Sequence, residues 1–214
     1  MKLFKYILFD FDGTLIDTNK LILLTLNETA QRYLNRSLKR DELNNILGKP
    51  LEEQMKSLSY ELWTCMLDYY KAFYKSNQDK MIEEFPQISI MLKKLKNIGC
   101  KNAIVSAKGR NGILHGLELF NYTMYIDFIV SAYDVQNNKP HPEPALKAVD
   151  YFNAPKNEVL LVGDSPYDIL CGKNAGLKTA LVDWTIFQKS QLSGLNPDYI
   201  IKTPLDLVRI IENP

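Results

Sequence analysis

The chain has 214 residues, of which 26 are lysine or arginine and 25 are aspartate or glutamate, so its formal net charge is +1. A chain this close to neutral lacks the basic excess that is typical of nucleic-acid-binding proteins, and we expect no nucleic-acid partner. With 46% hydrophobic and 24% charged residues, the composition is that of a folded globular protein, which excludes a disordered chain.

The sequence shows neither a membrane segment nor a disulfide framework. No apolar run approaches the roughly 20 residues that span a bilayer, and the apolar stretch near the start ends at Asp10. The cysteines Cys65, Cys100 and Cys171 are odd in number and far apart, which argues against paired disulfides and zinc ligands. We expect a cytoplasmic protein without a membrane partner.

Short apolar runs along the chain predict buried strands at 6–9, 103–105, 128–130, 159–162, 179–182 and 199–201. Apolar residues at helical spacing predict helices between them, at 88–98, 113–120, 144–152, 169–175 and 205–211. Strands that are apolar on both faces and alternate with helices indicate an α/β fold with a doubly wound parallel sheet. In such folds ligands bind at the carboxyl ends of the strands.

Residues 17–80 interrupt this alternation. They contain helical patterns at 22–34, 43–47 and 62–73 but no convincing strand, and Gly48-Lys49-Pro50 predicts a turn. We therefore expect an α/β core of residues 1–16 and 81–214 with an inserted α-helical cap of residues 17–80. The insertion either adds only stability or acts as a lid, because it leaves the core just after the first strand.

Two aspartates directly follow the first predicted strand. Asp10 and Asp12 stand in the segment 9–14, FDFDGT, whose glycine favours a tight turn that could bring both carboxylates to one point. Neighbouring carboxylates repel each other unless a proton or a cation lies between them, and Mg²⁺ prefers such oxygen ligands. The alternative is an ordinary surface turn.

A second acidic pair follows the fourth predicted strand. Asp164 and Asp168 stand in the segment 163–168, GDSPYD, where Asp164 could simply cap a helix whose first turn contains Pro166. However, the ends of the first and fourth strands of a doubly wound sheet are typically neighbours, so the two acidic pairs could lie together.

Ser106 and Lys139 follow two further strands. Ser106 begins the segment SAKG, where a hydroxyl and backbone N–H groups at a helix start could bind an anion, unless the serine is only an N-cap. Lys139 lies in the segment 138–144, NKPHPEP, whose prolines would restrict the loop that carries its ammonium group. A solvated surface lysine is the alternative.

Together these segments resemble the four motifs of the haloacid dehalogenase superfamily. In the family's order, the motifs are matched by Asp10 with Asp12, Ser106, Lys139, and Asp164 with Asp168. The resemblance extends over essentially the whole chain, because the family also carries a helical cap between the first two motifs. It implies a Rossmann-like core and the active site of a hydrolase.

The resemblance implies hydrolysis of a phosphate compound in two steps. Asp10 would attack phosphorus to give an aspartyl-phosphate, while Asp12 would protonate the leaving group and later take a proton from water. The implied ligands of Mg²⁺ are the side chains of Asp10 and Asp164, supported by Asp168, and the backbone carbonyl of Asp12.

The resemblance also implies how the substrate is bound. Ser106, the amide of Ala107 and Lys139 would bind the phosphoryl oxygens. Lys49 in the cap turn and Lys108 on the core could reach a negatively charged leaving group, although a solvated lysine is the alternative for Lys49.

An acid at Asp12 indicates the phosphatase branch, because a carbon–halogen bond needs no proton donor. The motifs and cap resemble phosphoglycolate phosphatases, whereas the segments 48–53, 139–144 and 184–186 resemble the pyrophosphatases of that subgroup. A β-phosphoglucomutase or a non-catalytic binding module on the same fold are further alternatives. We expect a hydrolase of a small phosphorylated metabolite or pyrophosphate that works as a monomer or weak homodimer.

Overall fold

A computed structural model describes residues 3–212 of the chain. The chain folds into two compact units, one made of the residues up to Ile16 and from Glu84 onward, the other of Asp17–Glu83. The second crossing between the units comes slightly later than Lys80, because helix α4 (Trp63–Met81) continues past that residue.

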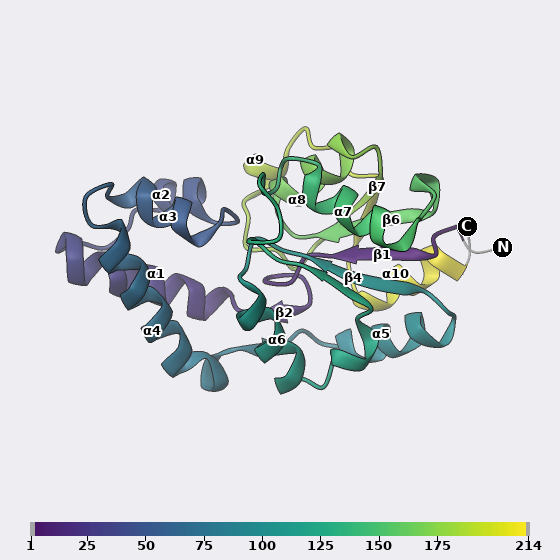
Figure 1. Ribbon diagram of the computed structural model, residues 1–214, viewed down its shortest axis with the longest axis horizontal. Helices are drawn as coiled ribbons and strands as arrows, with labels where there is room; N and C mark the ends of the chain where they lie inside the picture. The colour runs from purple at the N-terminus through teal and green to yellow at the C-terminus, as the bar shows by residue number, and fades with distance from the viewer. Residues whose placement is uncertain (1–2, 213–214) are drawn as a thin grey trace. The chain divides into compact units, whose positions relative to one another are not determined.

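The first unit contains a six-stranded parallel sheet, which confirms the predicted fold class (Figure 1). Its strands lie in the order β5 (Phe128–Val130), β4 (Lys101–Val105), β1 (Tyr6–Phe9), β6 (Val159–Gly163), β7 (Lys178–Val182) and β8 (Tyr199–Ile201). All six were predicted from their apolar runs. Strand β1 lies between β4 and β6, so the loops that follow these three strands leave from one edge of the sheet.

Helices cover both faces of the sheet, as Figure 1 shows. One face packs against α7 (Glu143–Phe152) and α8 (Pro166–Asn174), and the other against α5 (Ile88–Asn97) and α10 (Pro204–Glu212). Both faces are therefore buried, which explains why the strands are apolar without alternation. The remaining elements of this unit are α6 (Arg110–Leu119), α9 (Lys189–Leu192) and the 3₁₀ helices Thr123–Tyr125 and Lys156–Glu158.

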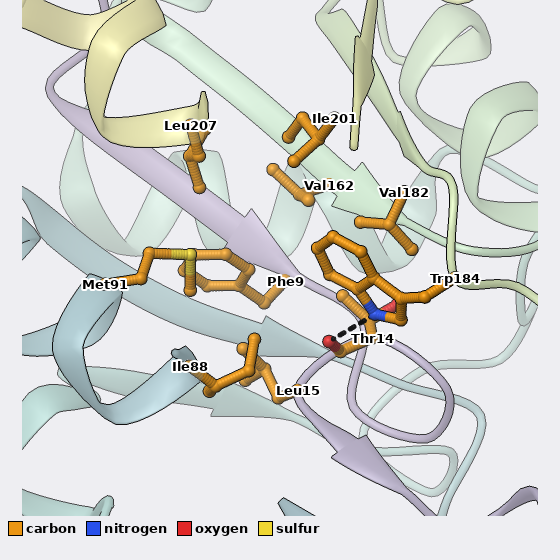
Figure 2. A pocket seen from close by; sticks show the side chains of 10 residues that line it. All are labelled: Phe9, Thr14, Leu15, Ile88, Met91, Val162, Val182, Trp184, Ile201 and Leu207. Carbon is orange, nitrogen blue, oxygen red and sulfur yellow. Dashed lines mark hydrogen bonds between the residues drawn. The ribbon is translucent and has the colours of Figure 1, made fainter. Parts of the chain in front are cut away.

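Strand β1 shows how one apolar run serves both faces. Leu8 belongs to the core beneath α7 and α8, whereas the next residue, Phe9, points to the opposite face. There a small apolar pocket lies between the sheet, α5 and α10, and Figure 2 shows the ten side chains that line it. Its cavity volume of ≈ 10 Å³ has room for about one water molecule, so the pocket is a feature of core packing.

The second unit is helical, with α1 (Asn19–Leu34), α2 (Arg40–Ile46), α3 (Leu51–Leu58) and α4. Helix α1 packs against α4, which also contacts α3. The sequence predicted α1, α2 and α4 but gave only a turn and no helix where α3 lies. Two-residue strands, β2 (Ile16–Asp17) and β3 (Glu83–Glu84), pair where the chain passes between the units. None of the helices within residues 3–212 is both long and apolar enough to cross a membrane.

Burial of the α5 face makes a prediction for stability. Leu92 in α5 is fully buried, whereas Leu114 in α6 is 37% exposed. We expect Leu92→Ala to lower the free energy of unfolding by about 2–5 kcal/mol, because it removes buried apolar surface and leaves a cavity. Leu114→Ala is the matched control and should cost less than about 1 kcal/mol. Equal losses in urea unfolding would contradict the assignment of the core face.

Candidate active site

Three candidate residues stand at the carboxyl ends of neighbouring strands. Asp10 follows β1, Ser106 follows β4 and Asp164 follows β6, and the sheet order places β1 between the other two. The ends of the first and fourth predicted strands are therefore neighbours, as expected. This edge is where ligands collect in doubly wound folds.

Lys139 reaches this edge from the loop between β5 and α7. Its Nζ donates to Asp10 Oδ1 at 2.8 Å, to Asp168 Oδ1 at 2.5 Å and to the Val105 carbonyl at 3.1 Å. The residue is only 6% exposed, so the alternative of a solvated surface lysine is wrong. Burial alone would lower the pKa of Lys139, but the charges of Asp10 and Asp168 more than offset this effect and raise it.

Three carboxylates gather around this ammonium group. One oxygen each of Asp10, Asp164 and Asp168 lies within 4.8 Å of the others, and all three residues are buried. Burial, and then the charge of Asp168, raise the pKa of Asp10 to about 7 despite the opposing effect of Lys139. Burial, and then the charges of Asp10 and Asp168, hold the pKa of Asp164 well above its ordinary value. The cluster therefore has a strong affinity for positive charge.

Asp168 is fixed by the first turn of α8. The Ser165 N–H and hydroxyl donate to Asp168 Oδ2 at 3.0 and 2.6 Å, and the Asp168 N–H lies 3.3 Å from Ser165 Oγ, which forms a capping box. The N-cap of this helix is therefore Ser165, and the alternative that made Asp164 the cap is wrong. Aspartate and serine are equally common N-cap residues, so the sequence could not decide between Asp164 and its neighbour Ser165.

Asp164 is positioned by a residue to which the sequence gave no role. The Thr185 hydroxyl lies 2.7 Å from the Asp164 carbonyl oxygen and 3.2 Å from Asp164 Oδ2. Thr185 follows β7, the strand beside β6, so its place at the same sheet edge was the signal that could have identified it. Gly13 is also needed here, because its φ is +79° and a Cβ on it would lie 2.6 Å from Asp164 Oδ2.

The three carboxylates fit a hard divalent cation. They offer only oxygen ligands, which Mg²⁺ prefers, and they are desolvated and repel one another although Lys139 donates to Asp10 and Asp168. The structure brings together the three side chains expected at the metal, and the carboxylate of Asp12 is not a member of this cluster. The proposed contribution of Asp12 is its backbone carbonyl, and that contribution stays a prediction.

The side chain of Asp12 is instead paired with Lys108. Lys108 Nζ donates to Asp12 Oδ1 at 2.9 Å and to Oδ2 at 3.1 Å. The Lys108 N–H donates to Ser106 Oγ at 3.3 Å. Helix α6 begins only after its N-cap, Gly109, so Ser106 is not the N-cap that the sequence allowed. Ser106 and the half-buried Ala107 thus belong to the loop between β4 and α6.

Lys49 belongs to the helical unit. It lies half-buried in the turn between α2 and α3, and its carbonyl accepts a hydrogen bond of 2.8 Å from Gln54 Nε2. The buried Gln54 therefore fixes the backbone of the predicted turn, and the contact of Lys49 with a substrate stays a prediction.

Comparison with known proteins gives the family. Residues 7–182 match the model of the haloacid dehalogenase-like hydrolases. The chain is 35% identical over 207 residues to the pyrophosphatase PpaX of Bacillus cereus, covering 97% of this chain and 96% of the relative. It is 38% identical over 205 residues to the pyrophosphatase PpaX of Halalkalibacterium halodurans, covering 96% and 95%.

Solved structures agree on the fold. A haloacid dehalogenase-like protein from Bacteroides fragilis superimposes with a TM-score of 0.86 at 28% identity, covering 95% of this chain and 99% of the other. A predicted phosphoglycolate phosphatase from Haemophilus somnus gives a TM-score of 0.89 at 21% identity, covering 98% and 99%.

The carboxylate cluster predicts a stabilisation by Mg²⁺ that depends on pH. Asp10 has a folded-state pKa near 7, above its ordinary value of 3.8, so without a cation the stability that it contributes falls as the pH rises between these values. Mg²⁺ binds the ionised form, so its stabilising effect should grow over the same range. We expect Mg²⁺ to raise the melting temperature more at pH 8 than at pH 6.

The same measurement on two variants locates the site. Asp164→Asn should abolish most of the Mg²⁺-induced shift, whereas Asp206→Asn, at an aspartate that pairs with Arg209 near the start of α10, should keep it. A full shift in Asp164→Asn would place the cation elsewhere.

Thr185 predicts an effect of one hydroxyl on cation affinity. Thr185→Val removes the donor that orients Asp164, and outer hydrogen bonds of this kind are worth about 10- to 100-fold in metal affinity. The midpoint of a Mg²⁺ titration, followed by melting temperature, should move to higher concentration by that factor. Thr185→Ser keeps the hydroxyl and serves as the control. An unchanged midpoint in Thr185→Val would show that the Thr185 hydroxyl does not contribute to Mg²⁺ affinity.

Proposed function

Because the chain belongs to the haloacid dehalogenase-like hydrolase family, we propose that it is a Mg²⁺-dependent phosphatase that acts on a small phosphate compound. One observation supports this proposal above the others: Asp10 lies at the sheet edge with Lys139 bonded to it and two further carboxylates beside it. A module that only bound phosphate would need no buried anion at that point.

Asp10 is the proposed nucleophile. One of its oxygens would attack phosphorus in line, forming an oxygen–phosphorus bond while the bond to the leaving group breaks, which gives an aspartyl-phosphate. Lys139 keeps the Asp10 side chain in a fixed position through its 2.8 Å hydrogen bond. Its charge also favours the approach of a phosphate anion to a carboxylate.

Asp12 is the proposed general acid and base. It would give its proton to the leaving oxygen in the first step and take a proton from water in the second, when that water releases phosphate from Asp10. Ser106, the amide of Ala107 and Lys139 are proposed to bind the phosphoryl oxygens.

The proposed ligands of Mg²⁺ are the side chains of Asp10 and Asp164, with Asp168 in support, and the carbonyl of Asp12. When bound, the ion would neutralise charge between these carboxylates and the phosphoryl group and act as a Lewis acid. The capping box holds the Asp168 side chain, and the Thr185 hydroxyl contacts both the backbone carbonyl and Oδ2 of Asp164, so these side chains need little rearrangement to serve as ligands.

The helical unit is proposed to act as a cap over the substrate. The chain enters it at Asp17, a few residues after Asp12, which supports a role near the chemistry. Lys49 in its ordered turn is proposed to attract the negative charge of the leaving group.

Inorganic pyrophosphate is the substrate that we propose first. The curated relatives with 35% and 38% identity over almost the whole chain are named pyrophosphatases, whereas the phosphoglycolate phosphatase at 21% identity supports only the fold. Phosphoglycolate is retained as the second candidate, because it shares the anionic leaving group. The phosphoglucomutase alternative has less support, because the solved structure named for that activity is 22% identical and supports only the fold. The non-catalytic alternative has less support because the relatives with 35% and 38% identity are named as enzymes.

We also propose that the enzyme acts in the cytoplasm and that one copy suffices. Cys65, Cys100 and Cys171 are all free thiols, which suits a reducing compartment. A single chain carries every residue of the proposed site.

The proposal predicts phosphate release that requires both Mg²⁺ and Asp10. The purified chain should hydrolyse pyrophosphate with Mg²⁺ present and lose activity when EDTA removes the ion. Asp10→Asn should lower kcat by about 10³-fold or more, because removal of a nucleophile disables both steps. Release would be measured as inorganic phosphate over time, against pyrophosphate, phosphoglycolate and glucose 1-phosphate.

Asp127→Asn provides the control, because Asp127 directly precedes β5 and accepts a hydrogen bond from the Asn102 N–H, at the amino ends of the strands and not at their carboxyl edge. It should retain activity. Wild type and Asp10→Asn that are equally inactive on all three compounds would overturn the proposal in favour of a binding module.

A further inference from the structure

The contact between Lys108 and Asp12 occupies the proposed acid at both oxygens. The distances from Lys108 Nζ are 2.9 and 3.1 Å, and the two side chains are only 15% and 21% exposed. An ammonium group that contacts both oxygens of a carboxylate competes with a leaving oxygen for the same two atoms.

The backbone of Lys108 is anchored on both sides. Its N–H donates to Ser106 Oγ, and its carbonyl accepts from the Ala132 N–H at 3.0 Å. The aliphatic part of its side chain passes over Gly112 in α6, where an added Cβ would lie 2.8 Å from Lys108 Cε. The glycine leaves room for this path, so the ammonium group is carried by a flexible stem on a fixed base.

The proposed reaction requires Asp12 to be free, whereas the ion pair keeps Asp12 bound to Lys108. Asp12 must be released to protonate the leaving oxygen, yet moving Lys108 away from it breaks an ion pair between two largely buried side chains, which is costly. A negative charge on the leaving group, delivered to the same edge of the site, would supply Lys108 with a new partner.

We propose that Lys108 is a specificity-determining residue that exchanges Asp12 for the anionic group of the leaving group, so that only a charged leaving group releases the acid. This inference rests on the proposed phosphatase function and deepens it. The substrate class is a phosphate compound whose leaving group carries its own negatively charged oxygen two or three bonds from the bridging oxygen, such as a second phosphate or a carboxylate.

The experiment compares substrates with and without this charge. Phosphoglycolate and ethyl phosphate both have a two-carbon leaving group, and only that of phosphoglycolate ends in a carboxylate. p-Nitrophenyl phosphate has a leaving group that departs with little need for protonation, so it reports on Asp10 and the phosphoryl site alone. Values of kcat and KM would be measured for all three with Mg²⁺ present.

Lys108→Met keeps the unbranched stem of the side chain and removes its ammonium group. It should lower kcat/KM for phosphoglycolate by about 10- to 100-fold, as expected for the loss of a hydrogen bond to a charged group. For ethyl phosphate kcat should rise by roughly two- to tenfold, because Asp12 is no longer held in an ion pair. Turnover of p-nitrophenyl phosphate should stay near that of the wild type.

Three further variants separate this role from a structural one. Lys108→Arg keeps the charge and should restore the preference for phosphoglycolate. Asp12→Asn combined with Lys108→Met should lose the gain on ethyl phosphate, because the gain depends on a released acid. Gly112→Ala should displace Lys108 and shift the preference in the direction of Lys108→Met, while Lys101→Met, at an exposed lysine of β4, should behave as wild type.

The outcomes distinguish the two proposals. A wild type that is inactive on all three esters and on pyrophosphate would overturn the phosphatase function and the exchange with it. An active wild type would overturn the exchange alone if Lys108→Met lowered all three activities equally, or if ethyl phosphate turnover failed to rise.

Discussion

The repulsion among three buried carboxylates is the constraint on which the site depends. Asp10, Asp164 and Asp168 lie within reach of one cation in a desolvated edge of the sheet, where like charges raise each other's pKa. The fold tolerates this arrangement because Lys139 donates to Asp10 and Asp168, the first turn of α8 donates to Asp168 as well, and the Thr185 hydroxyl lies within hydrogen-bond distance of Asp164. The remaining negative charge is what makes the edge suitable for Mg²⁺.

The proposed metal ligands are fixed by more contacts with the core than the proposed general acid is. Asp168 and Asp164 are tied to groups of the core, Ser165 and Thr185, and are almost fully buried. Asp12 and Lys108 hold each other, and both keep some exposure. This difference suits the proposed chemistry. Metal ligands bind best from fixed positions, whereas a general acid has to approach the leaving oxygen only when a substrate is present.

Much of the fold could be predicted because burial on both faces leaves a strong apolar signal in each central strand. The two-residue strands β2 and β3 carry no such signal. Helix α3 was not predicted because it directly follows the turn at Pro50, although Leu51, Met55 and Leu58 have helical spacing. At the site, motif positions located the aspartates and Lys139. Thr185 and the pairing of Lys108 with Asp12, residues that are 96 positions apart, depend on side-chain geometry that no local pattern encodes.

The position of Lys108 bears on where selectivity lies. Lys108 extends from the loop after β4, so selection by leaving-group charge would be made in the α/β core, beside the acid that it controls. The attraction proposed for Lys49 of the helical unit would then not decide whether the acid is released. This separation accounts for a core pairing that would otherwise only hinder catalysis: the ion pair withholds Asp12 from uncharged esters, and the correct substrate itself supplies the charge that ends it.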